Sequence, residues 1–210
     1  MPLRRGGLSQ PVLKGTHDRS SYSFMNKARS SRLTKAHWIR TGLAALSADG
    51  PSALQAEPLA RRLGTTKGSF YWHFADLPAF HVAIIAQWEE MAISQVVDAL
   101  APEHTDVGKL RRFAQVIADK SEGDAADTPI EPAIRAWALS NKEAAAAVAR
   151  VDSKRMSYLA ELLTEIGVTN PEMGRIIYCA SYVMEALAPT EAAKNAGAMG
   201  SLVDLVLALR

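Results

Sequence analysis

The chain has 210 residues, of which 48% are apolar, enough for the buried core of one ordinary domain or two small ones. Its longest stretch without Asp, Glu, Lys or Arg runs only from Leu77 to Trp88, far short of the roughly 18 apolar residues that a membrane-spanning helix needs, so a membrane protein is excluded. The net charge of +2 is unevenly spread, because residues 1–82 hold 12 Lys and Arg against 4 Asp and Glu, whereas residues 83–210 hold 12 against 18.

The first 32 residues are rich in Ser, Gly, Arg and Lys and show no apolar periodicity, so we expect a disordered tail. They hold 7 basic residues and 1 acidic residue, most of the excess positive charge of residues 1–82. A basic first part is typical of a protein that meets a polyanion. A flexible basic tail explains the same charge, so the charge alone leaves both interpretations open.

Two helices are predicted after the tail. Apolar residues on one helical face predict a helix over 33–48, which the sequence Asp-Gly-Pro at 49–51 ends. A short second helix is predicted over 54–63. It contains Pro58, which is tolerated only in a first turn, so the helix starts near Gln55 or Ala56.

A short third helix and a long fourth helix are predicted next. Thr65 or Thr66 is suited to cap the third helix, which spans 67–74. Asp76 is suited to cap the fourth, which reaches to about residue 101. Its apolar positions recur at helical spacing, at Leu77, Phe80, Ile84, Trp88, Met91 and Val96.

The remainder of the chain is also predicted to be helical. Turn signals separate five further helices, over 106–120, 131–140, 141–166, 171–187 and 193–210. No segment alternates apolar and polar residues over the length of a strand. The fold class is therefore all-α.

The segment over 59–74 has the pattern of a helix, a turn centred on Gly64 and a second helix, which is the arrangement that places a recognition helix in the major groove of DNA. The second helix opens at Thr66, where the helix dipole favours an anion. Small or polar residues that allow close approach to bases and phosphates come first, at Lys67, Gly68 and Ser69. Rings with polar donors follow, at Tyr71, Trp72 and His73. Phe70 and Phe74, four residues apart, are expected to face inward.

This segment resembles the TetR family of transcriptional regulators. The similarity rests on Gly-Thr-Thr-Lys-Gly-Ser-Phe-Tyr-Trp-His-Phe over 64–74, preceded by Leu59-Ala60 and followed by the helix start at Asp76. The resemblance implies three N-terminal helices that bind DNA and a larger helical domain that binds a small effector and dimerises. The implied DNA-binding residues are Gln55, Thr65, Thr66, Lys67, Gly68, Ser69, Tyr71, Trp72 and His73.

Two phosphate anchors that are frequent in the family differ in this sequence. Gln55 stands where Thr or Ser is frequent at the start of the second helix, and Pro78 stands where Lys is frequent at the start of the fourth. We hypothesise that basic tail residues replace these anchors, namely Arg4, Arg5, Lys27, Arg29 and Arg32. Deleting residues 1–30 should then flatten the salt dependence of DNA binding, by about one unit for each lost contact.

Bulky apolar and aromatic residues in the C-terminal part are candidates to line an effector cavity. They are Trp88, Met91, Phe113, Trp137, Met156, Tyr178 and Tyr182, with Tyr158 and Met184 of similar character. The alternative for each of them is a plain core position. The segment over 131–138, Glu-Pro-Ala-Ile-Arg-Ala-Trp-Ala, resembles a sequence common in the C-terminal domains of the family.

Two apolar stripes lie near the end of the chain. One contains Ile176, Ile177, Ala180, Val183, Met184 and Leu187. The other contains Met199, Leu202, Val203, Val206 and Leu209. Such stripes either complete a four-helix interface across a two-fold axis or are buried within one chain, and the resemblance favours a homodimer.

The predicted organisation is a basic tail over 1–32, a helix-turn-helix DNA-binding domain over 33–82 and a helical ligand-binding and dimerisation domain over 83–210. We predict a cytoplasmic, homodimeric repressor that binds a palindromic operator in double-stranded DNA and is released by a small effector. The alternative is a DNA-bound structural or partner-recruiting protein with a filled C-terminal core and no effector.

Other classes of site are not expected. The histidines show no metal-ligand spacing, and no catalytic or cofactor motif occurs in the sequence, so we expect no metal, cofactor or enzyme activity. The single cysteine, Cys179, excludes an intramolecular disulfide and is expected in the apolar core. No apolar segment follows the basic start of the chain, so a secretory signal is not expected.

Overall fold

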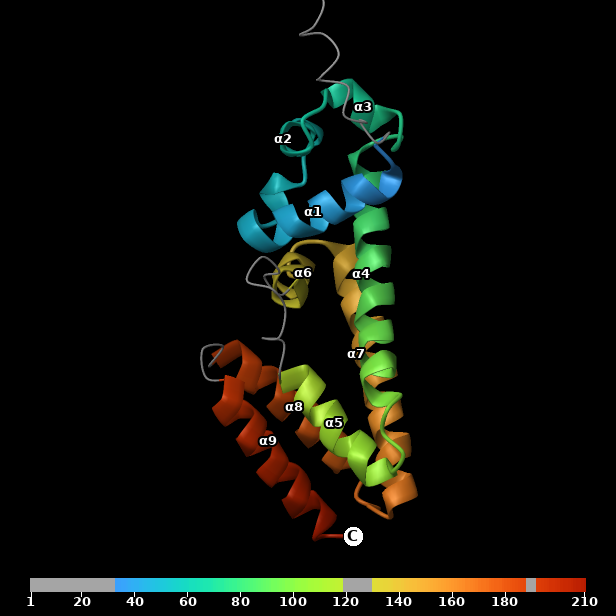
Figure 1. Cartoon of the computed structure of the whole chain (residues 1–210), viewed down its shortest axis with the longest axis vertical. Helices are drawn as coiled ribbons and strands as arrows, with labels where there is room; N and C mark the ends of the chain where they lie inside the picture. The colour runs from blue at the N-terminus through green and yellow to red at the C-terminus, as the bar shows by residue number, and fades with distance from the viewer. Residues whose placement is uncertain (1–32, 119–129, 188–191) are drawn as a thin grey trace, which may run out of the picture. The chain divides into compact units, whose positions relative to one another are not determined.

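A computed structural model describes residues 33–118, 130–187 and 192–210, and the predicted tail over 1–32 lies outside the described residues. The described part contains helices and no strand, which confirms the all-α fold class (Figure 1). Every predicted helix is present, with ends within three residues of those expected. The elements are α1 (Lys35–Asp49), the 3₁₀ helix η1 (Pro51–Ala53), α2 (Ala56–Arg62), α3 (Lys67–Tyr71), α4 (Leu77–Leu100), α5 (Asp106–Ala118), α6 (Ile130–Ala138), α7 (Lys142–Ile166), α8 (Glu172–Leu187) and α9 (Ala192–Leu207).

Local sequence sets the ends of several helices. Asp76 caps α4 by accepting a hydrogen bond from the backbone N–H of Ala79 at 2.8 Å, and Asn141 caps α7 by accepting one from Ala144 at 2.9 Å. Both are short polar side chains that satisfy an otherwise unpaired first-turn donor. Gly50, with φ 77°, ends α1 in a conformation that is strained for any residue with a Cβ atom.

The third helix is shorter than predicted. It ends at Tyr71 rather than at residue 74, and Trp72 and His73 form a turn. The amides of His73 and Phe74 still donate to the carbonyl of Phe70, at 2.9 and 3.1 Å. The chain leaves the helix here because Phe74 turns into the core while Asp76 begins the cap of α4.

The buried stripe of α4 corrects one prediction. Met91, expected among the apolar positions of the stripe, is 45% exposed, and Ala92 is buried in its place. The stripe follows Ile84, Trp88, Ala92 and Val96 at a constant spacing of four residues. Four residues are slightly more than one helical turn, so the residue at 91 falls beside the stripe.

Two clusters of buried apolar side chains form the core. The first joins helices α1 to α4 with α6 and the first half of α7, through residues such as Trp38, Phe80, Trp88 and Trp137. The second joins the end of α4 with α5, the second half of α7, α8 and α9. Helices α4 and α7 lie side by side and contribute to both clusters (Figure 1). The predicted domain boundary at residue 82 remains a prediction.

Two further observations concern the described helices. Cys179 is exposed, so its predicted core position is wrong; Ile177, Tyr178 and Ser181 turn inward from α8 and leave residue 179 on the outer side.

In the described part of the chain, no helix has both the length and the apolar content needed to cross a membrane.

Candidate nucleic-acid interface and ligand pocket

A tight turn joins α2 to α3. Gly64 adopts a positive φ of 62°, and the amide of Thr65 donates to the carbonyl of Ala60 at 2.9 Å, which closes the turn. Only glycine adopts this backbone conformation without strain. The predicted helix, glycine-centred turn and second helix therefore lie where the sequence placed them.

One aromatic residue holds the inner side of α3. Phe70 is fully buried, and its ring packs against those of Trp38, Phe74 and Phe80, with centroids 5.2 to 5.3 Å apart. Phe74 is also buried, so the predicted inward pair is confirmed. Because α3 has only five residues, too few to be stable alone, these contacts fix its position.

The opposite side of α3 faces solvent. Thr66, Lys67 and Gly68 are exposed at its start, and Tyr71 and Trp72 are 49% and 89% exposed at its end. Tyr and Trp are enriched at interfaces because their rings combine an apolar body with a polar donor, so two adjacent exposed rings of this kind are typical of a binding surface. The open side of Gly68 leaves room for another molecule, since an added Cβ would meet only Thr66 Oγ1, at 3.7 Å.

Three predicted residues are less accessible. Thr65, Ser69 and His73 are half-buried, and the ring of His73 lies 6.4 Å from that of Trp38. Thr66 occupies the N-cap position of α3, but its side chain makes no capping hydrogen bond. The hydroxyl oxygen is therefore not used as the cap acceptor of α3.

A shallow hollow brings separate elements of this surface together. Gln55, at the start of α2, shares it with Lys67 and Tyr71 of α3 and with Leu77 of α4, around a volume of about 260 Å³. Glu57 also lines the hollow, so its charges are mixed. The nine predicted DNA-binding residues thus lie in one region of the chain, from the start of α2 to the turn after α3, and their contacts with DNA remain a prediction.

The seven predicted effector-binding residues do not lie together in the structure. Trp88 and Trp137 belong to the first core cluster, whereas Phe113 and Tyr178 belong to the second, with Met156 packed against it. Met91 is exposed on α4. Tyr182 lies under the guanidinium of Arg135, whose Cζ is 4.6 Å from the ring centroid. Their part in ligand binding remains a prediction.

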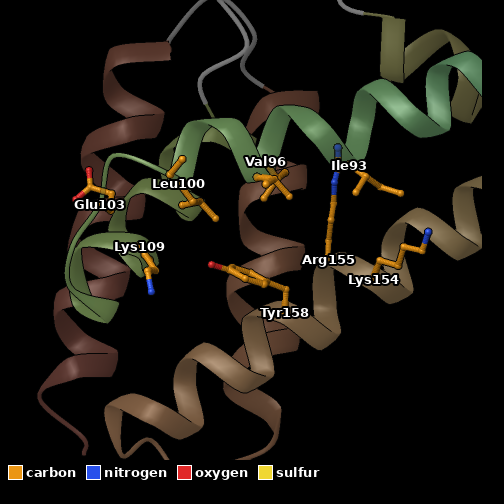
Figure 2. A pocket seen from close by; sticks show the side chains of 10 residues that line it. Ile93, Val96, Leu100, Glu103, Lys109, Lys154, Arg155 and Tyr158 are labelled. Atoms are coloured by element: carbon orange, nitrogen blue, oxygen red, sulfur yellow. The ribbon is translucent and has the colours of Figure 1, made fainter.

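A pocket of about 380 Å³ lies between α4, the start of α5 and α7 (Figure 2). None of the seven predicted effector-binding residues lines this pocket. Tyr158, which resembles those seven in character, does line it. The lining consists of Ile93, Val96, Val97, Leu100, Ala101, Glu103, Lys109, Lys154, Arg155 and Tyr158. No sequence pattern predicts that the charged lining residues lie together. Their common location depends on how α7 packs against α4 and α5.

A buried ionic cluster adjoins the pocket. Arg155 crosses from α7 to α4, where it donates to the carbonyl of Ala92 at 3.0 Å, and it pairs with Glu131 of α6 at 2.9 Å (Figure 2). Arg135 pairs with the same Glu131 at 2.7 Å and with Asp152 at 2.5 Å. Burial opposes the charge of Arg135, but its two carboxylate partners outweigh burial and raise its pKa. The cluster thus ties α6 to α4 and α7.

Tyr178 of α8 completes this cluster. Its hydroxyl donates to Asp152 at 2.6 Å, and burial together with this hydrogen bond raises the pKa of Tyr178 to about 12. The segment over 131–138 supplies Glu131 and Arg135, so its resemblance to the family was the one sequence signal for the cluster.

The N-terminal helices match the sequence model of a known protein family. The sequence model described as "Bacterial regulatory proteins, tetR family" matches residues 39–76, which run from within α1 to the cap of α4. A comparison with curated protein sequences gives no match.

Solved structures share the fold over most of the chain. SCO4454, a TetR-family transcriptional regulator from Streptomyces coelicolor, has 17% identity and a TM-score of 0.69, over 82% of this chain and 93% of that one. A transcriptional regulator from Saccharomonospora viridis in complex with choline has 10% identity and a TM-score of 0.70, over 81% and 95%. FadR from Bacillus subtilis, in complex with stearoyl-CoA, has 14% identity and a TM-score of 0.59, over 82% and 97%.

Proposed function

Because this chain is a TetR-family transcriptional regulator, we propose that it binds a palindromic operator as a dimer, represses transcription there, and leaves the operator when a small effector binds. The observation that supports this proposal most strongly is the two-sided character of α3. Its inner side is anchored by the fully buried Phe70, while its outer side leaves Lys67, Gly68 and Tyr71 exposed to solvent.

In this proposal α3 enters the major groove of DNA. Lys67, Gly68 and Ser69, in its first turn, approach base edges and the nearby backbone. Tyr71 and Trp72 contact phosphate oxygens, and Gln55 joins them from the start of α2, because the hollow at this surface places it near Lys67.

The dimer would form through α8 and α9, which pack against each other. Ile177, Met199, Val203 and Val206 are buried within the chain, so part of each predicted stripe belongs to the monomer core. Other apolar residues are exposed, at 45 to 64%, namely Ile176 and Val183 on α8, Leu205 on α9 and Leu209 in the turn after α9. Exposed apolar residues on two adjacent helices suit a four-helix interface around a two-fold axis.

The effector response would begin in the pocket between α4 and α7. A volume of about 380 Å³ is within the range of small-molecule sites and favours a ligand-responsive regulator over a protein with a filled C-terminal core. The S. viridis and B. subtilis proteins were solved with choline and with stearoyl-CoA. Two proteins of this fold thus hold small molecules, which supports a ligand-responsive function here.

Two structural connections lead from the pocket to the DNA-binding helices. The first is α4 itself, which lines the pocket at Val96 and packs against α1 at Phe80. The second is α6, which Arg155 holds through Glu131 and which packs against α1. On α6, Trp137 meets the ring of His81 edge-on at 5.2 Å, and His81 lies 3.2 Å from the carbonyl oxygen of Leu54, just before α2.

An effector that moves α4 or α6 would change the separation of the two recognition helices of the dimer. Both could then no longer enter successive major grooves. Effector and operator would therefore weaken each other's binding reciprocally.

Selection of bound sequences from random double-stranded DNA tests the proposal. The purified full chain should enrich a palindromic sequence, and Lys67→Ala should fail to enrich it. Lys142→Ala removes an exposed positive charge from the first turn of α7 and should behave like the parent protein. Enrichment of no sequence, or equal loss with both variants, would contradict the assignment of α3 as the recognition helix.

A further inference from the structure

The pocket between α4 and α7 has walls that are mainly apolar. Ile93, Val96, Val97 and Leu100 line it from α4, and Val97 is 61% exposed. An exposed valine beside other apolar side chains favours contact with an apolar molecule, because that contact removes apolar surface from water.

The charges around this pocket compensate one another. Lys109 pairs with Asp106 at 3.0 Å, and Arg155 pairs with Glu131 at 2.9 Å. The two other charged lining residues, Glu103 and Lys154, have opposite signs and lie at opposite ends of the pocket (Figure 2). The lining itself holds three cations and one anion, and the partners Asp106 and Glu131 bring the total to no net charge. A charged ligand would therefore lose hydration here without meeting a net opposite charge, which disfavours its binding.

Two lining residues carry a polar atom without a hydrogen-bond partner in the described part of the chain, the buried Nε of Arg155 and the hydroxyl of Tyr158, and the hydroxyl is the neutral one. The hydroxyl of Tyr158 makes no hydrogen bond within the described residues, and Figure 2 shows it directed toward the side where Leu100 and Lys109 lie. The ring itself is held by stacking on Phe113, with centroids 6.2 Å apart and planes 22° from parallel. A fixed ring with an unpaired hydroxyl is suited to recognise one oxygen of a ligand.

From these features we infer that the pocket between α4 and α7 binds an uncharged, largely apolar molecule whose single hydrogen-bonding oxygen meets the hydroxyl of Tyr158. This inference rests on the proposed function, since it names the chemical class of its effector. The apolar body lies against the α4 wall at Val97. The guanidinium of Arg155 stays with Glu131 and the carbonyl of Ala92, and its aliphatic stem forms one side of the site.

Three probes that share one apolar body test the class of ligand. They are 2-naphthol, 2-naphthoate and 2-naphthylmethylammonium, which at neutral pH are uncharged, negative and positive. Calorimetry or the fluorescence of the naphthalene ring measures their binding. We expect the full-length protein to bind 2-naphthol at least about tenfold more tightly than either charged probe. Equal or tighter binding of a charged probe, or no binding of any of the three, would overturn the inference.

Matched variants test the location. Tyr158→Phe should weaken binding of 2-naphthol about fivefold, the loss of one hydrogen bond, and should leave the affinity for the charged probes within about twofold. Val97→Glu should abolish binding. Val82→Glu introduces the same charge at another exposed valine of α4, outside the pocket, and should leave binding unchanged. Equal effects of the two glutamate variants would place the probe elsewhere and refute the site.

Operator binding, measured in parallel, separates this inference from the proposed function. If 2-naphthol binds at Val97 but leaves operator affinity unchanged, the ligand class stands and the effector response fails. If the operator is bound and no probe binds, the DNA-binding assignment stands and the inference fails.

Discussion

The ring of Trp38 on α1 meets that of Phe70 on α3 edge to face, with centroids 5.3 Å apart and planes at 82°. Both side chains are fully buried. This contact positions α3, a helix of only five residues, against the longer α1. The outer side of α3 is thus held in place and still exposed to solvent.

Phe70→Ala should lower the free energy of unfolding by about 3–5 kcal/mol, because it removes a buried ring from the centre of the aromatic cluster. Trp38→Phe should cost less. The Trp38 indole N–H is buried without a hydrogen-bond partner in the described part of the chain, and the substitution removes this unsatisfied donor. Urea denaturation compares the two variants. A larger loss with Trp38→Phe would show that the packing of the indole outweighs its unpaired N–H.

Tyr71→Ala and Trp72→Ala should both weaken operator binding. Trp72 is 89% exposed, so its loss should change the free energy of unfolding by no more than about 0.5 kcal/mol, whereas Tyr71 is 49% exposed and its ring meets that of Phe70 edge-on at 5.2 Å, so its loss should cost about 1 kcal/mol. Lys67→Ala should also flatten the salt dependence of binding by about one unit if it contacts a phosphate. Binding titrations at several salt concentrations, beside urea denaturation, measure both effects. Destabilisation that matches the loss of binding would indicate a structural role instead.

Glu131→Gln should destabilise the protein by about 3–5 kcal/mol. Glu131 is the carboxylate partner of Arg155, and the substitution leaves that buried guanidinium without its compensating charge. Glu143→Gln, an exposed substitution of the same kind at the start of α7, serves as the control and should be nearly neutral. Equal stability of the two variants would contradict the role assigned to the buried pair.

The raised pKa of Tyr178 predicts a loss of stability at alkaline pH. Tyrosines of the unfolded chain titrate near pH 10, whereas folded Tyr178 keeps its proton until about pH 12. Its stabilisation is thus complete below about pH 10 and is lost as the pH rises toward 12. Two pH units correspond to about 3 kcal/mol. Tyr178→Phe should lose less stability than the parent protein over this range, measured by urea denaturation at each pH; identical slopes would contradict the prediction.

Val183→Arg should produce a monomer, because it places a charge on the exposed apolar side of α8. Val82→Arg changes another exposed valine, on α4, and should remain a dimer. Light scattering after size-exclusion chromatography gives the mass directly. A dimer of Val183→Arg would place the interface elsewhere, and a monomer of the parent protein would contradict the proposed dimer.

Much of the fold follows from local patterns in the sequence. Apolar periodicity predicted the first and fourth helices, turn signals separated the C-terminal ones, and the cap at Asp76 marked where α4 begins, because all these signals depend on neighbouring residues. The same holds for the inward pair of Phe70 and Phe74, whose spacing of four residues places them on one helical face.

The ends of short elements and the membership of the core were harder to predict. Helix α3 stops before Trp72 because Phe74 packs against Phe80, a contact beyond the helix itself. Cys179 and Met91 are apolar in character but exposed, since which side of a helix is buried depends on the helices that pack against it.

By itself, the sequence determined the helices, the helix-turn-helix and the residues on the outer side of α3, since all of these depend on residues within a few turns of one another. Only the tertiary structure decided where the pocket lies and which charges compensate around it. Arg155 meets Glu131 across 24 residues and Ala92 across 63. No periodicity along the chain encodes such distances, because they result from the packing of α4, α6 and α7 in space.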